Sequence, residues 1–276
     1  MGDDLDGQQN PLNGIIYHWN GSQWSQSLRA SSGQTYDQFE SVTCSSSSDC
    51  WSVGYAGPNQ LQYNFLPGIA PSVVGAAALI EHWDGSDWSI VPTPPAAAPM
   101  GQDLTSVTCS NSSDCWAVGA TMDASGNPSS SLVENWDGST WTITPSLDPL
   151  TPANILTAVT CLGTSDCWAT GATDSASGQN TTPIPYIENW NGSSWTVEPS
   201  PNVVAFGYLS GLACVPESGC FATGFSATNL NNNTTLQTLI EQLQLPPASS
   251  QGMWMTGSDG GVFSFGDAQF HGSTGG

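Results

Sequence analysis

The chain has 276 residues, which is enough for one large all-β domain or two small domains. It carries one basic residue, Arg29, against 23 acidic residues, so its net charge at pH 7 is −22. Because binding to phosphates needs Lys and Arg, we expect no nucleic-acid partner and no docking on an anionic bilayer. No apolar run reaches the roughly 18–20 residues of a transmembrane helix, so we also expect no membrane insertion.

The first expected strands lie at residues 11–28, after a polar start, MGDDLDGQQN, that does not resemble a signal peptide. GIIYHW and QWSQS flank an Asn-Gly pair there. Asn-Gly and Asp-Gly between apolar runs predict a hairpin, because the turn needs a positive φ. This pair of strands corresponds to the last two strands of a longer repeat.

Four segments further along the chain share a C-x5-C pattern followed by an aromatic residue and, three positions later, a glycine. They are TCSSSSDCWSVG (43–54), TCSNSSDCWAVG (108–119), TCLGTSDCWATG (160–171) and ACVPESGCFATG (213–224). Five residues between the cysteines suit a hairpin loop closed by a structural disulfide. A metal site is disfavoured because no histidine repeats with the cysteines, and a redox site because the spacing is not C-x-x-C.

All eight cysteines are therefore expected to form structural disulfides within these units: Cys44, Cys50, Cys109, Cys115, Cys161, Cys167, Cys214 and Cys220. Disulfides persist in oxidising compartments. We therefore expect an extracellular or cell-surface location and a chain from which any export signal has been removed.

A second motif, an aromatic-rich turn of the form W-[ND]-G-S-x-W, alternates with the first. It occupies 17–24, 81–88, 134–141 and 188–195, and the two motifs together repeat about every 53 residues. Four short strands in such a unit are typical of one β-propeller blade. The first full repeat is longer because of an apolar, Pro-bounded insertion at 55–78.

The predicted fold is an all-β β-propeller of five four-stranded blades, one of them split between N- and C-terminal strands. The propeller is expected to span 1–250, with repeats at about 11–28 (half a blade), 40–95, 104–147, 156–200 and 209–247. The tail, 251–276, is expected either to complete the split blade or to pair with a neighbouring chain.

The motif SVTC-x5-CWAVG … LIEHWDGSxWSIVPTP resembles uncharacterised secreted repeat proteins of actinobacteria and related bacteria, over residues 11–246. The tail, GMWMTGSDGGVFSFGDAQFHGSTGG, resembles a different repeat found on the surfaces of the same bacteria. These resemblances imply a propeller fold and an extracellular location. They imply no catalytic residue.

The repeated polar side chains are the other candidates for a site. They are the histidines His18 and His82, which Asn135 and Asn189 replace in other repeats; the glutamates Glu81, Glu134, Glu188 and Glu241; and the loop aspartates Asp49, Asp114 and Asp166. The histidine position is expected to be structural; the remaining histidine, His271, is not part of this repeat position. The glutamates could line the channel and bind a cation, lie on the rim, or bond a neighbouring backbone. The aspartates are expected to cap turns, with calcium binding as the alternative.

These observations favour a non-enzymatic structural or adhesive protein with no catalytic residues, no metal and no cofactor. We expect it to associate with itself, as an oligomer or a polymer, through its terminal strands or the 55–78 loop. The side chains chosen for that contact are Trp254, Phe263, Phe265, Phe65 and Leu66. One alternative is a lectin-like propeller that binds glycans on its twelve tryptophans, which are otherwise expected to pack between blades. A less favoured alternative is a glycoside hydrolase with paired carboxylates.

Overall fold

The computed structural model shows β-strands as the regular structure of the chain. The residues that it describes are 2–5, 11–58, 75–95, 101–123, 126–148, 153–174, 183–200, 206–215, 219–227, 236–243, 253–256 and 262–265. These ranges contain no helix, and hence none long and apolar enough to cross a membrane. The all-β prediction is confirmed.

Two complete four-stranded antiparallel sheets define the repeating unit. The second blade has the strand order β11-β10-β9-β8 and the third has β12-β13-β14-β15. Their strands are β8 (Gln102–Asn111), β9 (Asp114–Met122), β10 (Pro128–Trp136), β11 (Trp141–Ile143), β12 (Ala153–Gly163), β13 (Asp166–Asp174), β14 (Pro183–Trp190) and β15 (Trp195–Glu198). Each strand pairs with its neighbour in the chain, as the four strands expected in each repeat require.

The first blade shares one larger sheet with the N-terminal strands. Its own strands are β4 (Tyr36–Ser46), β5 (Asp49–Gly57), β6 (Ala77–Trp83) and β7 (Trp88–Ile90). The N-terminal strands are β1 (Gly2–Leu5), β2 (Pro11–Trp19) and β3 (Trp24–Ser27). β2 pairs with β1 and β3 and meets β4 through a single parallel bridge, between Asn13 and Asp37. We call β2 and β3 the N-terminal half-blade.

The fourth blade contains three described strands, β16 (Gly207–Val215), β17 (Gly219–Ala227) and β18 (Leu236–Leu243). The last two strands, β19 (Met253–Thr256) and β20 (Val262–Phe265), form a separate two-stranded sheet. Among the described strands, β19 and β20 pair with each other and not with the N-terminal half-blade. The count of five blades and the split blade therefore remain predictions.

A glycine follows each C-x5-C motif because the first strand of the blade bulges opposite it. Gly119 pairs with Leu104, and the register shifts immediately afterwards, before Ser106. A Cβ atom on Gly119 would lie 2.0 Å from the carbonyl oxygen of Asp103. The equivalent glycines are Gly54, Gly171 and Gly224, each with 1.9 Å to such an oxygen. Any other residue would require the backbone to move, so the bulge explains the glycine of the motif.

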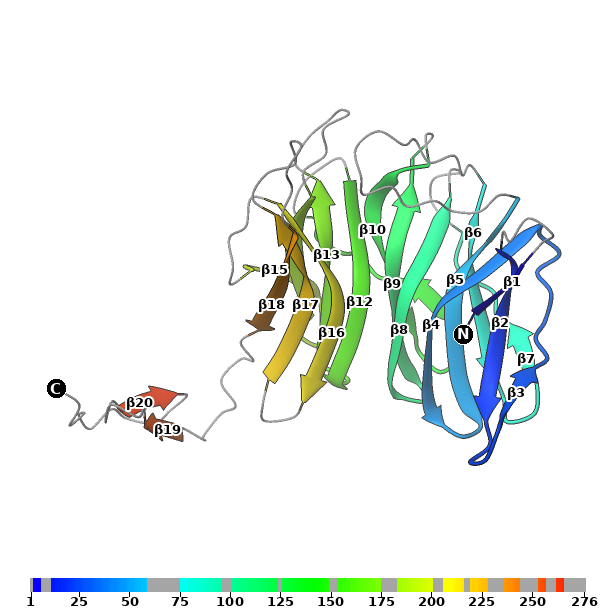
Figure 1. Ribbon diagram of the computed structural model, residues 1–276, viewed down its shortest axis with the longest axis horizontal. Helices are drawn as coiled ribbons and strands as arrows, with labels where there is room; N and C mark the ends of the chain where they lie inside the picture. Colours follow the sequence, from blue (N-terminus) through cyan, green and yellow to red (C-terminus); the bar gives the residue numbers. More distant parts are fainter. Residues whose placement is uncertain are drawn as a thin grey trace.

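The blades stack face to face in chain order, as in a β-propeller (Figure 1). Trp51, Val53 and Ile80 of the first blade share one buried cluster with residues of the second, including Leu104 and Trp141. The second and third blades, and the third and fourth, share equivalent clusters. Hydrogen bonds also join the first strands: the Thr105 hydroxyl donates to the Leu156 carbonyl at 2.7 Å. The hydrophobic core of the protein therefore lies between blades.

Candidate functional site

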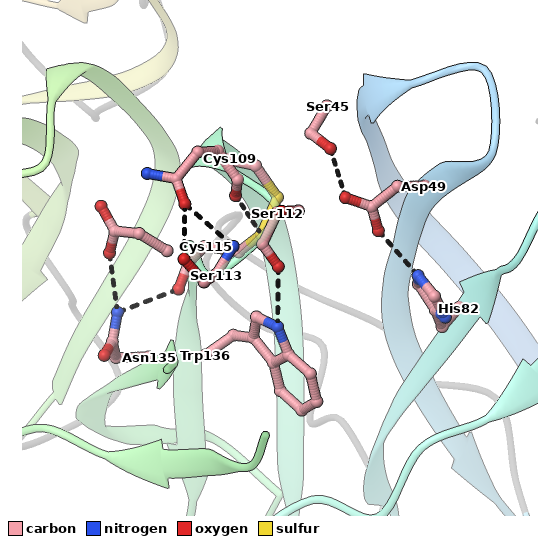
Figure 2. The surroundings of a disulfide bond; sticks show 11 residues. Ser45, Asp49, His82, Cys109, Ser112, Ser113, Cys115, Asn135 and Trp136 are labelled. Atoms are coloured by element: carbon pink, nitrogen blue, oxygen red, sulfur yellow. Dashed lines mark hydrogen bonds and ion pairs between the residues drawn. A yellow bond between two sulfur atoms is a disulfide. The ribbon is translucent and has the colours of Figure 1, made fainter. Parts of the chain in front are cut away.

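The eight cysteines are paired at disulfide distance within the four expected loops. The pairs are Cys44–Cys50, Cys109–Cys115, Cys161–Cys167 and Cys214–Cys220, and none is free. Each pair joins directly opposite residues of the first and second strands. The indole nitrogen of Trp136 on the third strand donates to the Ser112 carbonyl in this loop at 3.2 Å (Figure 2). The disulfide loop thus anchors the W-[ND]-G-S-x-W turn.

The turns themselves confirm the prediction of a positive φ at glycine. Gly138 has a φ of 92°, and its equivalents Gly21, Gly85 and Gly192 have 97°, 99° and 91°. The preceding Asp137 carboxylate accepts the backbone N–H groups of Ser139 and Thr140, both at 2.8 Å. The capping role expected of the loop aspartates therefore belongs to the Asn or Asp of this second motif.

The loop aspartates of the C-x5-C motif have a different partner, the residue before the first Trp on the third strand. His82 lies 2.7 Å from Asp49, while Asn135 donates to Asp114 and Asn189 to Asp166, both at 3.3 Å. No group of three His, Cys, Asp or Glu side chains suited to a metal is found among the described residues. The expectation that the His/Asn position is structural agrees with this pairing. At the same position in the half-blade, His18 is exposed. His271 lies outside the described residues.

Ser45, Asp49 and His82 lie in a row, but their order does not suit nucleophilic catalysis (Figure 2). The Ser45 hydroxyl and the His82 ring both contact the Asp49 carboxylate. In a Ser-His-Asp triad the histidine stands between the other two, because it must take the proton from the serine. Here the aspartate stands between them, so His82 is not positioned to activate Ser45.

The four repeated glutamates, Glu81, Glu134, Glu188 and Glu241, are fully buried in the third strands of their blades. Their burial places them neither on the rim nor in contact with bulk solvent. Burial raises the pKa of Glu134 from 4.5 to about 8, and that of Glu188 from 4.5 to about 7. For Glu81, burial also dominates, and the pKa rises to about 7 although the Arg29 guanidinium opposes the shift.

Three of the four glutamates contact one position of the preceding unit, five residues after the second Trp of the turn motif. Ser146 donates to Glu188 and Ser200 donates to Glu241, both at 2.7 Å. In the first blade this position is Thr93, which instead donates to the Ala78 carbonyl of its own blade at 3.5 Å. Both Glu134 carboxylate oxygens consequently lack a hydrogen-bond partner among the described residues. Glu188 and Glu241 therefore link neighbouring blades, whereas Glu134 does not.

Arg29, the only basic residue, occupies the same position in the N-terminal half-blade. Its guanidinium lies 2.7 Å from Asp37 and 3.2 Å from Glu81 in the first blade, and it donates to the Gly14 carbonyl at 2.8 Å. It also lies 5.3 Å from the centre of the Phe39 ring. No sequence pattern predicts this role for Arg29. The structure shows that it fastens the half-blade to the first blade.

A further buried carboxyl, also missed from the sequence, lies on the first strand of the second blade. Asp103 is fully buried, and among the described residues no side chain donates to either of its carboxylate oxygens. Burial, and secondarily the charge of Glu40, raise its pKa well above the usual value. Burial likewise raises the pKa of Tyr208, with smaller contributions from Glu40 and Asp103. Gln38, Ile155 and Tyr208 occupy its position in the other blades, so no repeated residue type marks this position in the sequence.

The predicted self-association residues fall in the less fully described parts of the chain. Trp254 lies in β19, opposite Ser264, while Phe263 and Phe265 lie in β20, opposite Met255 and Met253. Phe65 and Leu66 lie outside the described residues. Their part in an interface remains a prediction.

Comparisons with known proteins do not assign this chain to a family. No protein-family model matches the chain, and no curated protein matches it. Among solved structures, the chain is similar to one described as "YCF48 bound to D1 peptide", with a TM-score of 0.40 and 14% sequence identity. The match covers 82% of this chain and 62% of that chain, so this chain spans less than two thirds of its length.

Proposed function

We propose that this protein is a non-enzymatic extracellular β-propeller with a structural or adhesive role, and that it assembles with copies of itself. The main support is that most of the repeated polar side chains are engaged in contacts that hold the blades. His82 and Asn135 are paired with loop aspartates, and Glu188 accepts a hydroxyl from the preceding blade. A side chain held in this way serves the frame of the molecule rather than a reaction.

The extracellular part of the proposal is supported by the cysteines. Four pairs at disulfide distance are compatible with an oxidising compartment outside the cytosol. Disulfides in such small loops stabilise a chain by limiting the freedom of its unfolded state, by about 2 kcal/mol each. This stabilisation suits a protein that must persist outside the cell.

The first test is electron microscopy of the full, non-reduced chain, with its mass measured at several concentrations. Filaments, sheets or defined oligomers are expected. Particles of one chain mass at every concentration would contradict self-assembly.

The alternative is a carbohydrate-binding propeller, and the N-terminal half-blade favours it. The Trp19 and Trp24 side chains are 47% and 66% exposed, unlike the buried tryptophans between blades. Exposed aromatic faces are suited to stacking on sugar rings. Binding on a glycan array that disappears in Trp24→Ala, but not in Ile143→Ala, would support this function over assembly.

A further inference from the structure

The contact between neighbouring blades follows one rule. In the first and second blades, the aromatic residue after the second cysteine packs on the Trp pair of the blade that follows. Trp51 lies 4.7 Å from Trp136 and 5.3 Å from Trp141, measured between ring centroids. Trp116 repeats this contact, at 4.7 Å from Trp190 and 5.2 Å from Trp195. Each blade therefore has a donating face, which carries the aromatic residue, and each of the first three blades has a receiving face, which carries the Trp pair.

The donating face of the fourth blade is exposed. Its aromatic residue, Phe221, is 39% exposed, whereas the equivalent tryptophans, Trp51, Trp116 and Trp168, are 4% exposed or less. The same face carries Ile240, which is 61% exposed. The residues equivalent to Ile240 are Ile80, Val133 and Ile187, all 1% exposed or less. The following blade covers this position in the first three blades, so the fourth blade presents an apolar surface shaped for another blade.

The receiving face of the N-terminal half-blade is exposed too, and its Trp pair already has the required geometry. The Trp19 and Trp24 rings lie 5.6 Å apart at 46°. The pairs that receive an aromatic residue elsewhere, Trp136–Trp141 and Trp190–Trp195, lie 5.9 Å apart at 41° and 6.0 Å apart at 45°. Because this site is already arranged, little ordering would oppose binding.

We propose that the donating face of the fourth blade, centred on Phe221, docks on the Trp19–Trp24 pair of a second copy of this chain. This inference rests on the proposed function and identifies the contact through which the copies assemble. The two faces lie at opposite ends of the stack of blades (Figure 1), so the second copy continues the stack of the first. A head-to-tail contact of this kind generates a filament, or a ring if its rotation closes.

Charge sets the conditions under which this contact forms. The four side chains at its centre, Phe221, Ile240, Trp19 and Trp24, are uncharged, but each copy carries a net charge of −22. Repulsion between copies is long-ranged and screened by salt, whereas the apolar contact is not weakened by it. Assembly is therefore expected to increase between about 20 and 300 mM salt.

The test uses two variants of the full chain, studied by analytical ultracentrifugation. Phe221→Asp blocks the donating face at one end of the stack of blades, and Trp24→Asp blocks the Trp pair at the other end. Ile143→Asp is the matched control, because Ile143 is a 44%-exposed apolar residue on a fourth strand, away from both faces. Circular dichroism first confirms that the variants are folded, and Phe221→Ser and Trp24→Ser replace any that are not. Each end variant should raise the dissociation constant at least about tenfold, since buried aromatic residues dominate such interfaces.

Mixing the two end variants provides the decisive readout. Phe221→Asp keeps an intact Trp pair and Trp24→Asp keeps an intact donating face, so the mixture should form a heterodimer that grows no further. If both variants and their mixture assemble like the parent, this interface is wrong, although self-assembly itself stands. If the parent remains a monomer at every concentration and salt, both the interface and the proposed self-assembly are wrong.

Discussion

Replacing Glu134 with Gln tests whether the buried glutamates make this protein more stable in acid than at neutral pH. Glu134 is fully buried without a hydrogen-bond partner among the described residues, and burial raises its pKa from 4.5 to about 8. The folded protein therefore keeps a proton that the unfolded chain has already lost. The resulting stability is complete below about pH 4.5 and is lost as the pH rises through about 8.

The size of the effect follows from the pKa of Glu134. One pKa unit corresponds to about 1.4 kcal/mol, so this residue should lower the free energy of unfolding by about 3 kcal/mol between pH 5 and pH 7.5. Glu81 and Glu188, each with a pKa of about 7, act in the same direction. Gln does not titrate, so Glu134→Gln should flatten the pH dependence and be more stable than the parent at pH 7.5.

The assay is urea unfolding followed by tryptophan fluorescence at pH 5, 6, 7 and 7.5, at constant ionic strength. Glu188→Gln should show a smaller gain, because Ser146 already donates to that carboxylate at 2.7 Å. Asp87→Asn, which removes one charge from an exposed turn, controls for the change in net charge. Parallel pH curves for Glu134→Gln and the parent would refute the argument.

Three further changes test the links between and within blades. Thr93→Ser copies Ser146 and Ser200; without the methyl group that restricts the rotamer, the hydroxyl should turn from the Ala78 carbonyl to Glu134. This should add about 1 kcal/mol to the free energy of unfolding, and an unchanged urea midpoint would contradict it. Arg29→Met leaves Asp37 and Glu81 buried without their cation and should lower the free energy of unfolding by about 3–5 kcal/mol. Adding Asp37→Asn and Glu81→Gln removes both buried charges and should recover most of that loss. Gly119→Ala forces a contact at the first-strand bulge and should lower the free energy of unfolding by more than about 2 kcal/mol. In the control Gly163→Ala, the added Cβ meets nothing within 4 Å, so the change should stay within about 0.5 kcal/mol. Equal effects of the two substitutions would argue against the bulge as the reason for the glycine.

Structural features that depend on residues close together in the chain could be predicted from the sequence. The cysteine pairing and the positive φ of Gly138 follow from local spacing, and both agree with the structure. Alternation along the chain marks the first strand of the second blade less clearly, because the bulge after Leu104 in β8 breaks it.

Contacts across blades were harder to predict. The residue that faces each glutamate is Ser146 or Ser200 in two blades, but Thr93 and Arg29 in the other two, so residue type does not mark the position. Its partner lies 41 to 52 residues away. Only the offset between stacked sheets brings the two side chains together, and periodicity along a single strand contains no information on that offset.

The short C-x5-C loops also bear on how the chain acquires its bonds. Eight cysteines permit 105 fully paired arrangements, of which only one is native. A chain that paired its cysteines at random would therefore become trapped with non-native disulfides. Here every partner is six residues away, on the adjacent strand of the same hairpin. Closing so small a loop takes well under a microsecond, far faster than encounters between distant cysteines. Correct oxidation can therefore proceed blade by blade while the chain is still emerging, without later reshuffling.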